Sequence, residues 1–200
     1  MRRIAKGAAI IAQHKPFSLL SPSTKPLGNK KFAVDLLTRK NLRGKSWNRD
    51  VDPCDIRGLK CAGRLDADST GLLLWTDDEQ LEQFIIGPST PVEKEYLVRI
   101  TGHASWSESQ FQDTLGLLRE GISLDGKPLL RSGVRRLNES QLQMTLLEGR
   151  HRQIRRMLAT VGLQVDAIKR VRIGKLRLAS LPVGCWSSLS AAQAASMFLK

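Results

Sequence analysis

One acidic side chain stands out beside an apolar segment. Asp66 follows Arg64 and precedes the run Gly71–Thr76, which has the length and composition of a buried strand. Charged residues next to a core strand need partners or partial solvation, which places them at the edge of a cleft or loop. A carboxylate held there beside a basic residue is suited to act as a nucleophile or base. An ordinary turn is the alternative interpretation, because Asp68 and Ser69 are common turn residues.

Basic side chains are concentrated between residues 149 and 177. This region holds nine Lys or Arg residues and one acidic residue, Asp166, in a chain whose formal net charge is +13. Four of the arginines fall within residues 150–156, where they repel one another unless anions compensate. Phosphates would do so, and the planar guanidinium suits bidentate phosphate contacts. A solvated basic face is the simpler interpretation, but the density of the charge favours a nucleic acid partner.

Composition excludes several other classes of protein. The chain has 200 residues, enough for one large domain or two small ones. Its three cysteines, Cys54, Cys61 and Cys185, form no close pair, which argues against a disulfide framework or a zinc site. No stretch approaches the roughly 18 apolar residues of a membrane span, and no phosphate-binding glycine loop or dinucleotide fingerprint is present. We therefore expect a cytoplasmic protein, a monomer, that uses no metal, no nucleotide cofactor and no membrane.

The hydrophobic pattern predicts strands in hairpins with interspersed helices, hence an α+β fold with a mostly antiparallel sheet. Strands are predicted over residues 8–12, 59–65, 71–76, 96–100, 133–137, 142–147 and 171–178. Helices are predicted over 32–37, 77–86 with an acidic start at 77–79, 106–120 behind a capping box from Ser105 to Glu108, 151–161 and a short stretch after Ser190. Residues 1–7 read as a mobile basic tail and residues 39–55 as a long surface loop.

Three motifs in this order resemble the RsuA-type branch of the pseudouridine synthases. They are Gly63–Asp66 with Gly71–Thr76, the Lys-x-Tyr strand in Glu93–Val98, and Glu148–Met157 with Gly162 and Lys169–Gly174. The segment Ile11–Phe17 also resembles the first strand of the branch's catalytic domain. The resemblance covers about residues 8 to 190, and the joint occurrence of the motifs makes it specific. It departs from the branch at Glu79, where glycine is usual, and at Ser187, where arginine is usual.

This resemblance implies a fold and a reaction. The implied pseudouridine synthase fold is a central, mostly antiparallel sheet in two halves, with flanking helices and an RNA-binding cleft, here a catalytic domain over residues 8–200. The implied reaction is isomerisation of a specific uridine in RNA to pseudouridine, with no cofactor or metal. The chain resembles the short members that lack an N-terminal S4-like RNA-binding domain, and several of these act on large-subunit ribosomal RNA.

The resemblance also assigns roles to residues. It makes Asp66 the essential carboxylate, either by covalent attack on the sugar or by assisting proton and charge transfer. It makes Tyr96 the tyrosine that packs on the target base and moves a proton, and Arg155 the basic partner of Asp66. Residues expected to bind RNA are Arg64, which would fill the gap left by the extruded base, and the group Arg150, Arg152, Arg156, Lys169, Arg170 and Arg172.

Two other functions stay open. The first is a non-catalytic RNA-binding factor for ribosome assembly, although such a protein has no evident need for Asp66, Tyr96 and Arg155 together. The second is a basic DNA-binding protein, for which the sequence shows no recognition-helix arrangement.

Overall fold

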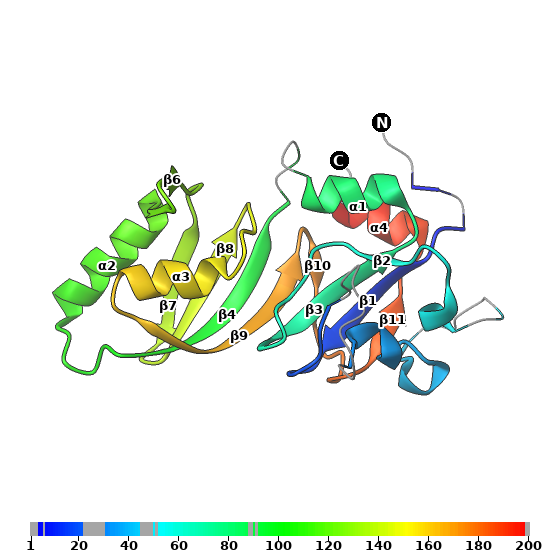
Figure 1. Cartoon of the computed structure of the whole chain (residues 1–200), viewed down its shortest axis with the longest axis horizontal. Coiled ribbons are helices and arrows are strands. Elements are labelled where there is room, and N and C mark those ends of the chain that lie inside the picture. The colour runs from blue at the N-terminus through cyan, green and yellow to red at the C-terminus, as the bar shows by residue number, and fades with distance from the viewer. Residues whose placement is uncertain are drawn as a thin grey trace. The chain divides into compact units, whose positions relative to one another are not determined.

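The chain folds into two compact units. The computed structural model describes residues 4–5, 7–21, 31–44, 50, 52–87, 90 and 92–198. Unit 1 comprises Met1–Val92 and Arg170–Lys200, and unit 2 comprises Glu93–Lys169. Each unit combines β-strands with two α-helices (Figure 1), so the predicted α+β class is confirmed.

The sheet of unit 1 is built on two long antiparallel neighbours. Strand β1 (Ile10–Lys15) pairs with β3 (Ser69–Thr76) along its whole length. The order is β11-β1-β3-β9, with β2 also paired to β3 and β10 to β9. The bounds of these strands are Lys60–Cys61 for β2, Gln164–Ile173 for β9, Leu176–Arg177 for β10 and Trp186–Ser188 for β11. Residues of β9 from Arg170 onwards belong to unit 1.

One face of this sheet is covered by two helices. Helices α1 (Glu79–Ile86) and α4 (Ala191–Phe198) lie over it in Figure 1. Leu72 and Leu74 of β3 share a buried cluster with side chains from both helices. Helix α1 begins where its acidic sequence predicts, because the side chain of Asp78 accepts hydrogen bonds from the second and third N–H groups of the helix.

The other face packs against short 3₁₀ turns. These turns are η1 (Ala33–Leu36), in the segment 32–37 for which a helix was predicted, and η2 (Arg39–Asn41) and η3 (Pro53–Asp55), in the described part of the predicted 39–55 surface loop. The indole N–H of fully buried Trp75 donates to Gln13 Oε1 at 2.9 Å, and Gln13 Nε2 donates to the carbonyl of Ala33 at 2.7 Å. A glutamine in the core therefore joins the sheet to the turns that cover it.

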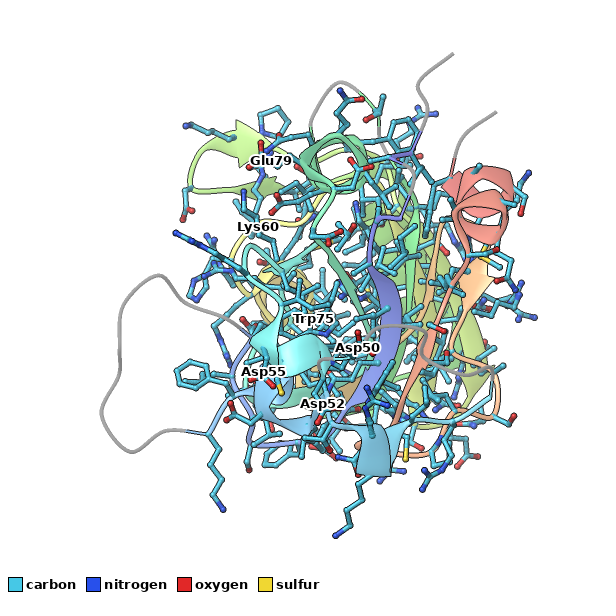
Figure 2. All side chains as sticks on the ribbon, turned by 90° about the vertical axis from the view of Figure 1, so that its right-hand side faces the viewer. Asp50, Asp52, Asp55, Lys60, Trp75 and Glu79 are labelled. Carbon is cyan, nitrogen blue, oxygen red and sulfur yellow. The ribbon has the colours of Figure 1, made fainter. Side chains whose placement is uncertain are left out.

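The start of the chain and the edge of the sheet are tied by acidic side chains. The N–H of Ala5 donates to Asp78 Oδ2 and that of Ala9 to Asp77 Oδ1, each at 2.7 Å. Part of the predicted tail over residues 1–7 is thus attached to unit 1, while residues 1–3 and 6 lie outside the described ranges. Figure 2 shows Lys60 and Glu79 pointing toward each other, with 2.7 Å between Nζ and Oε1.

Unit 2 contains antiparallel strands and its own helices. Its strand order is β9-β4-β8-β7. The bounds are β4 Lys94–Thr101, α2 Glu108–Glu120, β5 Ser123–Leu124, β6 Lys127–Pro128, β7 Gly133–Asn138, β8 Gln141–Leu146 and α3 Gln153–Thr160. Helices α2 and α3 lie beside β7 and β8 in Figure 1. The predicted hairpin around residues 138–140 is present as the β7–β8 turn.

Several predicted bounds are corrected by the tertiary structure. Helix α2 is capped by Ser107 with Gln110, two residues beyond the predicted box, because these two side chains satisfy each other's main-chain N–H groups. The predicted strand over 59–65 shrinks to β2, since Gly63 has a φ of +92° and the chain leaves the ladder there. The predicted strand over 171–178 is broken by a turn at Gly174.

Among the residues that the structure describes, no helix has both the length and the apolar character that a membrane span needs.

A glycine of β3 lies against the main chain of β9. Gly71 has a φ of +107°, and a Cβ built on it would lie 2.2 Å from the carbonyl oxygen of Arg170 and 2.6 Å from its nitrogen. Main-chain atoms on both sides leave no flexible group to move, so only glycine lets β3 and β9 approach this closely.

We predict that Gly71→Ala lowers the free energy of unfolding by more than about 3 kcal/mol, because it adds a main-chain clash to an unfavourable φ. Gly58→Ala is the matched control, since Gly58 has a φ of +84° and open space around its Cβ position. The control should lower the free energy of unfolding by only about 1–2 kcal/mol. Urea unfolding followed by circular dichroism measures both, and equal losses would refute the predicted clash.

Candidate functional site

Asp66 lies on a tight turn that leads directly into β3. The N–H of Ser69 donates to the carbonyl of Asp66 at 3.1 Å, which closes the turn. Asp66 and Asp68 are partly buried, whereas Leu65 and Ser69 are buried. The turn predicted for these residues is therefore present, and it holds a carboxylate at the edge of the core of unit 1.

Lys15 binds the downstream side of this turn. Its side chain is fully buried at the end of β1. The ammonium group donates to the carbonyls of Ser69 at 2.7 Å, Pro16 at 3.0 Å and Ala67 at 3.4 Å. Three carbonyl acceptors match the three protons of an ammonium group, which compensates its loss of water.

The environment of Lys15 also changes its acidity. Burial lowers the pKa of Lys15 from 10.5 to about 8, because the ammonium form is desolvated. The charges of Asp68 and Asp66 oppose this change by raising the pKa, and the charge of Arg170 lowers it further. At neutral pH the Lys15 side chain is therefore still mostly cationic, and its charge attracts both carboxylates of the turn, those of Asp66 and Asp68.

Arg170 binds the upstream side of the same turn. Its guanidinium donates to the carbonyls of Leu72 at 2.7 Å, Gly63 at 2.9 Å and Arg64 at 3.4 Å. Arg170 is only 2% exposed. The prediction that Arg170 contacts RNA is therefore wrong for this structure, because its donors are used inside unit 1.

A hydroxyl group completes the attachment of the turn. Ser21 Oγ donates to the carbonyl of Leu65 at 2.8 Å and accepts from the N–H of Leu65 at 3.0 Å. Ser21 is buried, so these bonds are protected from water. The residues before and after Asp66 are thus held at defined atoms, which limits the positions that the carboxylate can take.

Tyr96 lies in unit 2, on β4. It faces the same side of the strand as Val98 and Ile100, and it stands opposite Met144 of β8. It is 9% exposed. Within the described ranges, the structure gives its hydroxyl no hydrogen bond to another residue. A buried ring with a free hydroxyl suits contact with a ligand, and the predicted role of Tyr96 stays a prediction.

Two arginines at α3 are used to hold a hairpin. Arg150 donates to the carbonyls of Lys127 at 3.3 Å and Pro128 at 2.6 Å, and Arg156 binds the carboxylate of Asp125 at 2.5 Å. These acceptors lie in the β5–β6 hairpin and its turn. The predicted phosphate contacts of Arg150 and Arg156 stay predictions, but part of each guanidinium already has an internal partner.

The remaining basic residues differ in exposure. Arg155, the predicted partner of Asp66, lies in unit 2 on α3 and donates to the carbonyl of Val165 at 2.9 Å. Its pairing with Asp66 of unit 1 stays a prediction. Arg64 is exposed, whereas the other predicted RNA contacts Arg152, Lys169 and Arg172 are partly buried. Arg172 also donates to the carbonyl of Gly174 at 2.7 Å.

Two of the residues that organise the turn were not predicted from the sequence. Lys15 and Ser21 lie about 50 residues before Asp66, and neither was expected to contact it. The polar stretch Gln13–Lys15 at the end of an apolar run could have indicated a buried lysine. Such a lysine needs hydrogen-bonding partners, because charged residues are fully buried only when they are paired.

Comparison with known proteins identifies relatives of most of this chain. The family model described as RNA pseudouridylate synthase matches residues 9–160. Ribosomal large subunit pseudouridine synthase B of Salmonella typhimurium is 37% identical over 167 residues, which are 80% of this chain and 55% of that protein. The Haemophilus influenzae protein of the same name is 38% identical over 164 residues, or 78% and 43% of the two chains. The chain thus spans about half the length of these curated relatives.

Solved structures agree with the sequence relatives. A crystal structure of pseudouridylate synthase matches 96% of this chain and 75% of its own, with a TM-score of 0.76 and 26% identity. An archaeal box H/ACA Nop10–Cbf5 complex matches 84% of this chain and 49% of its own, with a TM-score of 0.56 and 15% identity, which shows a shared fold. The predicted pseudouridine synthase fold is confirmed.

We predict that Arg170→Met lowers the free energy of unfolding by about 2–4 kcal/mol, because three carbonyls around the turn lose their donor. Arg170→Lys should recover little of this, since one ammonium group cannot replace the guanidinium fork. Exposed Arg177 on β10 provides the control, and Arg177→Met should change stability by less than about 0.5 kcal/mol. Urea unfolding measures the stability of all three variants. If Arg170→Met were as stable as Arg177→Met, the hydrogen bonds of Arg170 to the turn would not stabilise the fold.

We predict that Lys15 makes stability rise with pH between about 8 and 10.5. In this range the unfolded chain, with a lysine pKa of 10.5, binds a proton that the folded chain has released, so higher pH favours the folded state. The stability of wild type relative to Lys15→Met should therefore increase as pH rises through this window.

Lys60 supplies a control of opposite sign. The hydrogen bond and charge of Glu79 raise the pKa of Lys60, so the stability of wild type relative to Lys60→Met should fall at high pH. Urea unfolding across the pH range tests both differences. If Lys15→Met does not fold, ¹³C NMR of lysine-labelled wild type measures the Lys15 pKa directly, and a spectrum in which no lysine titrates near 8 would refute the prediction.

Proposed function

Because the chain belongs to the RNA pseudouridylate synthase family, we propose that it isomerises a specific uridine in RNA to pseudouridine. The observation that carries this proposal is the placement of Asp66. Its carboxylate is partly buried on a turn whose main chain is bound by Lys15 and Arg170. A carboxylate fixed in this way needs little reorganisation when charge develops on a bound sugar.

The proposed reaction leaves the composition of the uridine unchanged. The bond from the ribose C1′ to the base nitrogen N1 breaks, the uracil turns, and a new bond joins C1′ to the ring carbon C5. The proton on C5 is then lost and N1 gains one. Asp66 would either attack C1′ and form a covalent intermediate or stabilise the positive charge on the sugar, and both mechanisms need an ionised carboxylate.

Two residues of unit 2 complete the proposed catalytic group. Tyr96 would hold the extruded base with its ring, and its hydroxyl would help to move a proton. Arg155 would pair with Asp66 and favour its ionised form. These roles follow from the family motifs that the two residues occupy, and the low exposure of Tyr96 supports contact with an enclosed base.

Binding of folded RNA is supported by the charge of the chain. A formal net charge of +13 attracts a polyanion and makes binding strongly dependent on salt. The target nucleotide must leave its stack at a cost of a few kcal/mol. Exposed Arg64 would fill the space that it leaves, and Arg152, Lys169 and Arg172 would contact phosphates together with the free donors of Arg150 and Arg156.

The substrate we propose is large-subunit ribosomal RNA. The names of the relatives support this choice. We also propose that the reaction takes place in the cytoplasm, where bacterial ribosomes lie. We propose that a single chain is the active form. The alternative is a ribosome-assembly factor that binds RNA without catalysing a reaction. Deletion of the protein and the Asp66→Asn variant distinguish the two functions.

We predict that deleting the protein removes one or a few pseudouridines from ribosomal RNA, and that Asp66→Asn does not restore them. The amide keeps the shape of the side chain but removes its charge, so the rate should fall by at least about 10³-fold. Pseudouridine mapping of total RNA from deleted and rescued cells measures both effects.

Asp55→Asn is the control, because Asp55 is an exposed carboxylate of unit 1 outside the Asp66 turn. It should restore every site that wild type restores. An unchanged map after deletion would refute the enzyme, whereas restoration by Asp66→Asn would leave an enzyme that does not depend on Asp66.

A further inference from the structure

One aromatic side chain is exposed right beside the Asp66 turn. Phe17 is 62% exposed, and among the aromatic residues that the structure describes it alone is exposed to this degree. The other large apolar side chains exposed in the described ranges are aliphatic: Ile86, Leu117, Leu130, Leu137 and Val183. A single exposed apolar side chain is common on protein surfaces, so it is the position of Phe17 beside the Asp66 turn that calls for an explanation.

Phe17 belongs to a segment that wraps around the turn. Lys15 and Ser18 donate to the same acceptor, the carbonyl of Ala67, at 3.4 Å from Nζ and 2.9 Å from the Ser18 nitrogen. Three residues later, Ser21 binds the main chain of Leu65. The residues on both sides of Phe17 are therefore attached to the residue that follows Asp66 in the chain.

The backbone at this point adopts a conformation that is unusual for its residue types. Ser18 has a φ of +67°, in the left-handed region that favours glycine. Pro16 restricts the chain on the other side of Phe17 by fixing its own φ. The Ser18 nitrogen in this conformation donates to the carbonyl of Ala67, directly after exposed Phe17. Strain of this kind is retained mainly where it positions a functional group.

We propose that Phe17 stacks on an unpaired nucleobase of the RNA substrate, next to the uridine that reaches Asp66. This inference rests on the proposed function. RNA recognised outside a duplex presents unstacked bases, and aromatic side chains bind them by stacking. Exposed Arg64, which we propose fills the space left by the target nucleotide, lies two residues before Asp66, so unstacked RNA would meet the protein at this turn.

A nucleobase fits this position better than an apolar protein surface. A single exposed aromatic ring offers little area to a protein partner, whereas one ring is enough to stack one base. The attachment of the segment to Ala67 also links the position of the ring to that of the catalytic carboxylate. Phe17 would therefore hold a nucleotide near the target uridine in place, as a positioning residue.

The test measures tritium release from ribosomal RNA labelled at uracil C5, prepared from cells that lack the protein. Phe17→Ala should raise the KM for this RNA by roughly five- to 50-fold, the effect of losing one stacked base. Phe17→Trp should retain the wild-type KM, whereas Phe17→Leu should behave like Phe17→Ala because it keeps apolar character without an aromatic face. Leu117→Ala is the matched control, since Leu117 is 58% exposed on α2.

RNA affinity is measured separately in the Asp66→Asn background, where no turnover occurs. There Phe17→Ala should weaken binding by a similar factor, and this readout does not depend on the proposed activity. Wild-type turnover with no effect of Phe17→Ala on KM or affinity would overturn the stacking role and leave the proposed function intact. A wild-type-like Phe17→Leu would also overturn it. An effect seen on large-subunit particles but not on naked RNA would assign Phe17 to a protein partner instead.

Discussion

Burial of two cations against main-chain carbonyls is the constraint on which the candidate site depends. Lys15 and Arg170 come from opposite ends of the chain, and both lose their water inside unit 1. Burying a charge is costly unless hydrogen bonds replace the lost solvation. The carbonyls around Asp66 supply those bonds, and they can do so only while the turn keeps its shape. The cations and the turn therefore stabilise each other, and Asp66 is positioned as a result.

This constraint extends into the sheet through a glycine. Arg170 reaches the carbonyl of Leu72 because its own main chain lies against Gly71, where any side chain would clash. The glycine that follows the Asp66 motif thus has a packing role that is as specific as the charge of the aspartate. A local sequence motif and a distant arginine become one structural element through close approach of two strands.

Basic residues in this chain serve structure as well as RNA binding. Arg170 lies within the core, and Arg150 and Arg156 hold the β5–β6 hairpin against α3. A guanidinium has five N–H donors, so one arginine can bind the protein and still present donors to phosphate. The net charge indicates the kind of partner, but the contacts of each arginine decide which of them can reach it.

The sequence by itself determined the fold class, the family and the position of Asp66 on a turn before a buried strand. These follow from local information, since apolar periodicity, turn residues and ordered motifs are all readable along the chain. Only the tertiary structure decided that Arg170 is internal, that Lys15 and Ser21 hold the turn, and that Phe17 is exposed beside it. The physical reason is that burial and hydrogen bonding of a polar side chain depend on segments 50 to 100 residues away, such as Lys15 with Ser69 and Arg170 with Leu72. Residue type alone does not distinguish an arginine that binds a carbonyl from one that binds a phosphate.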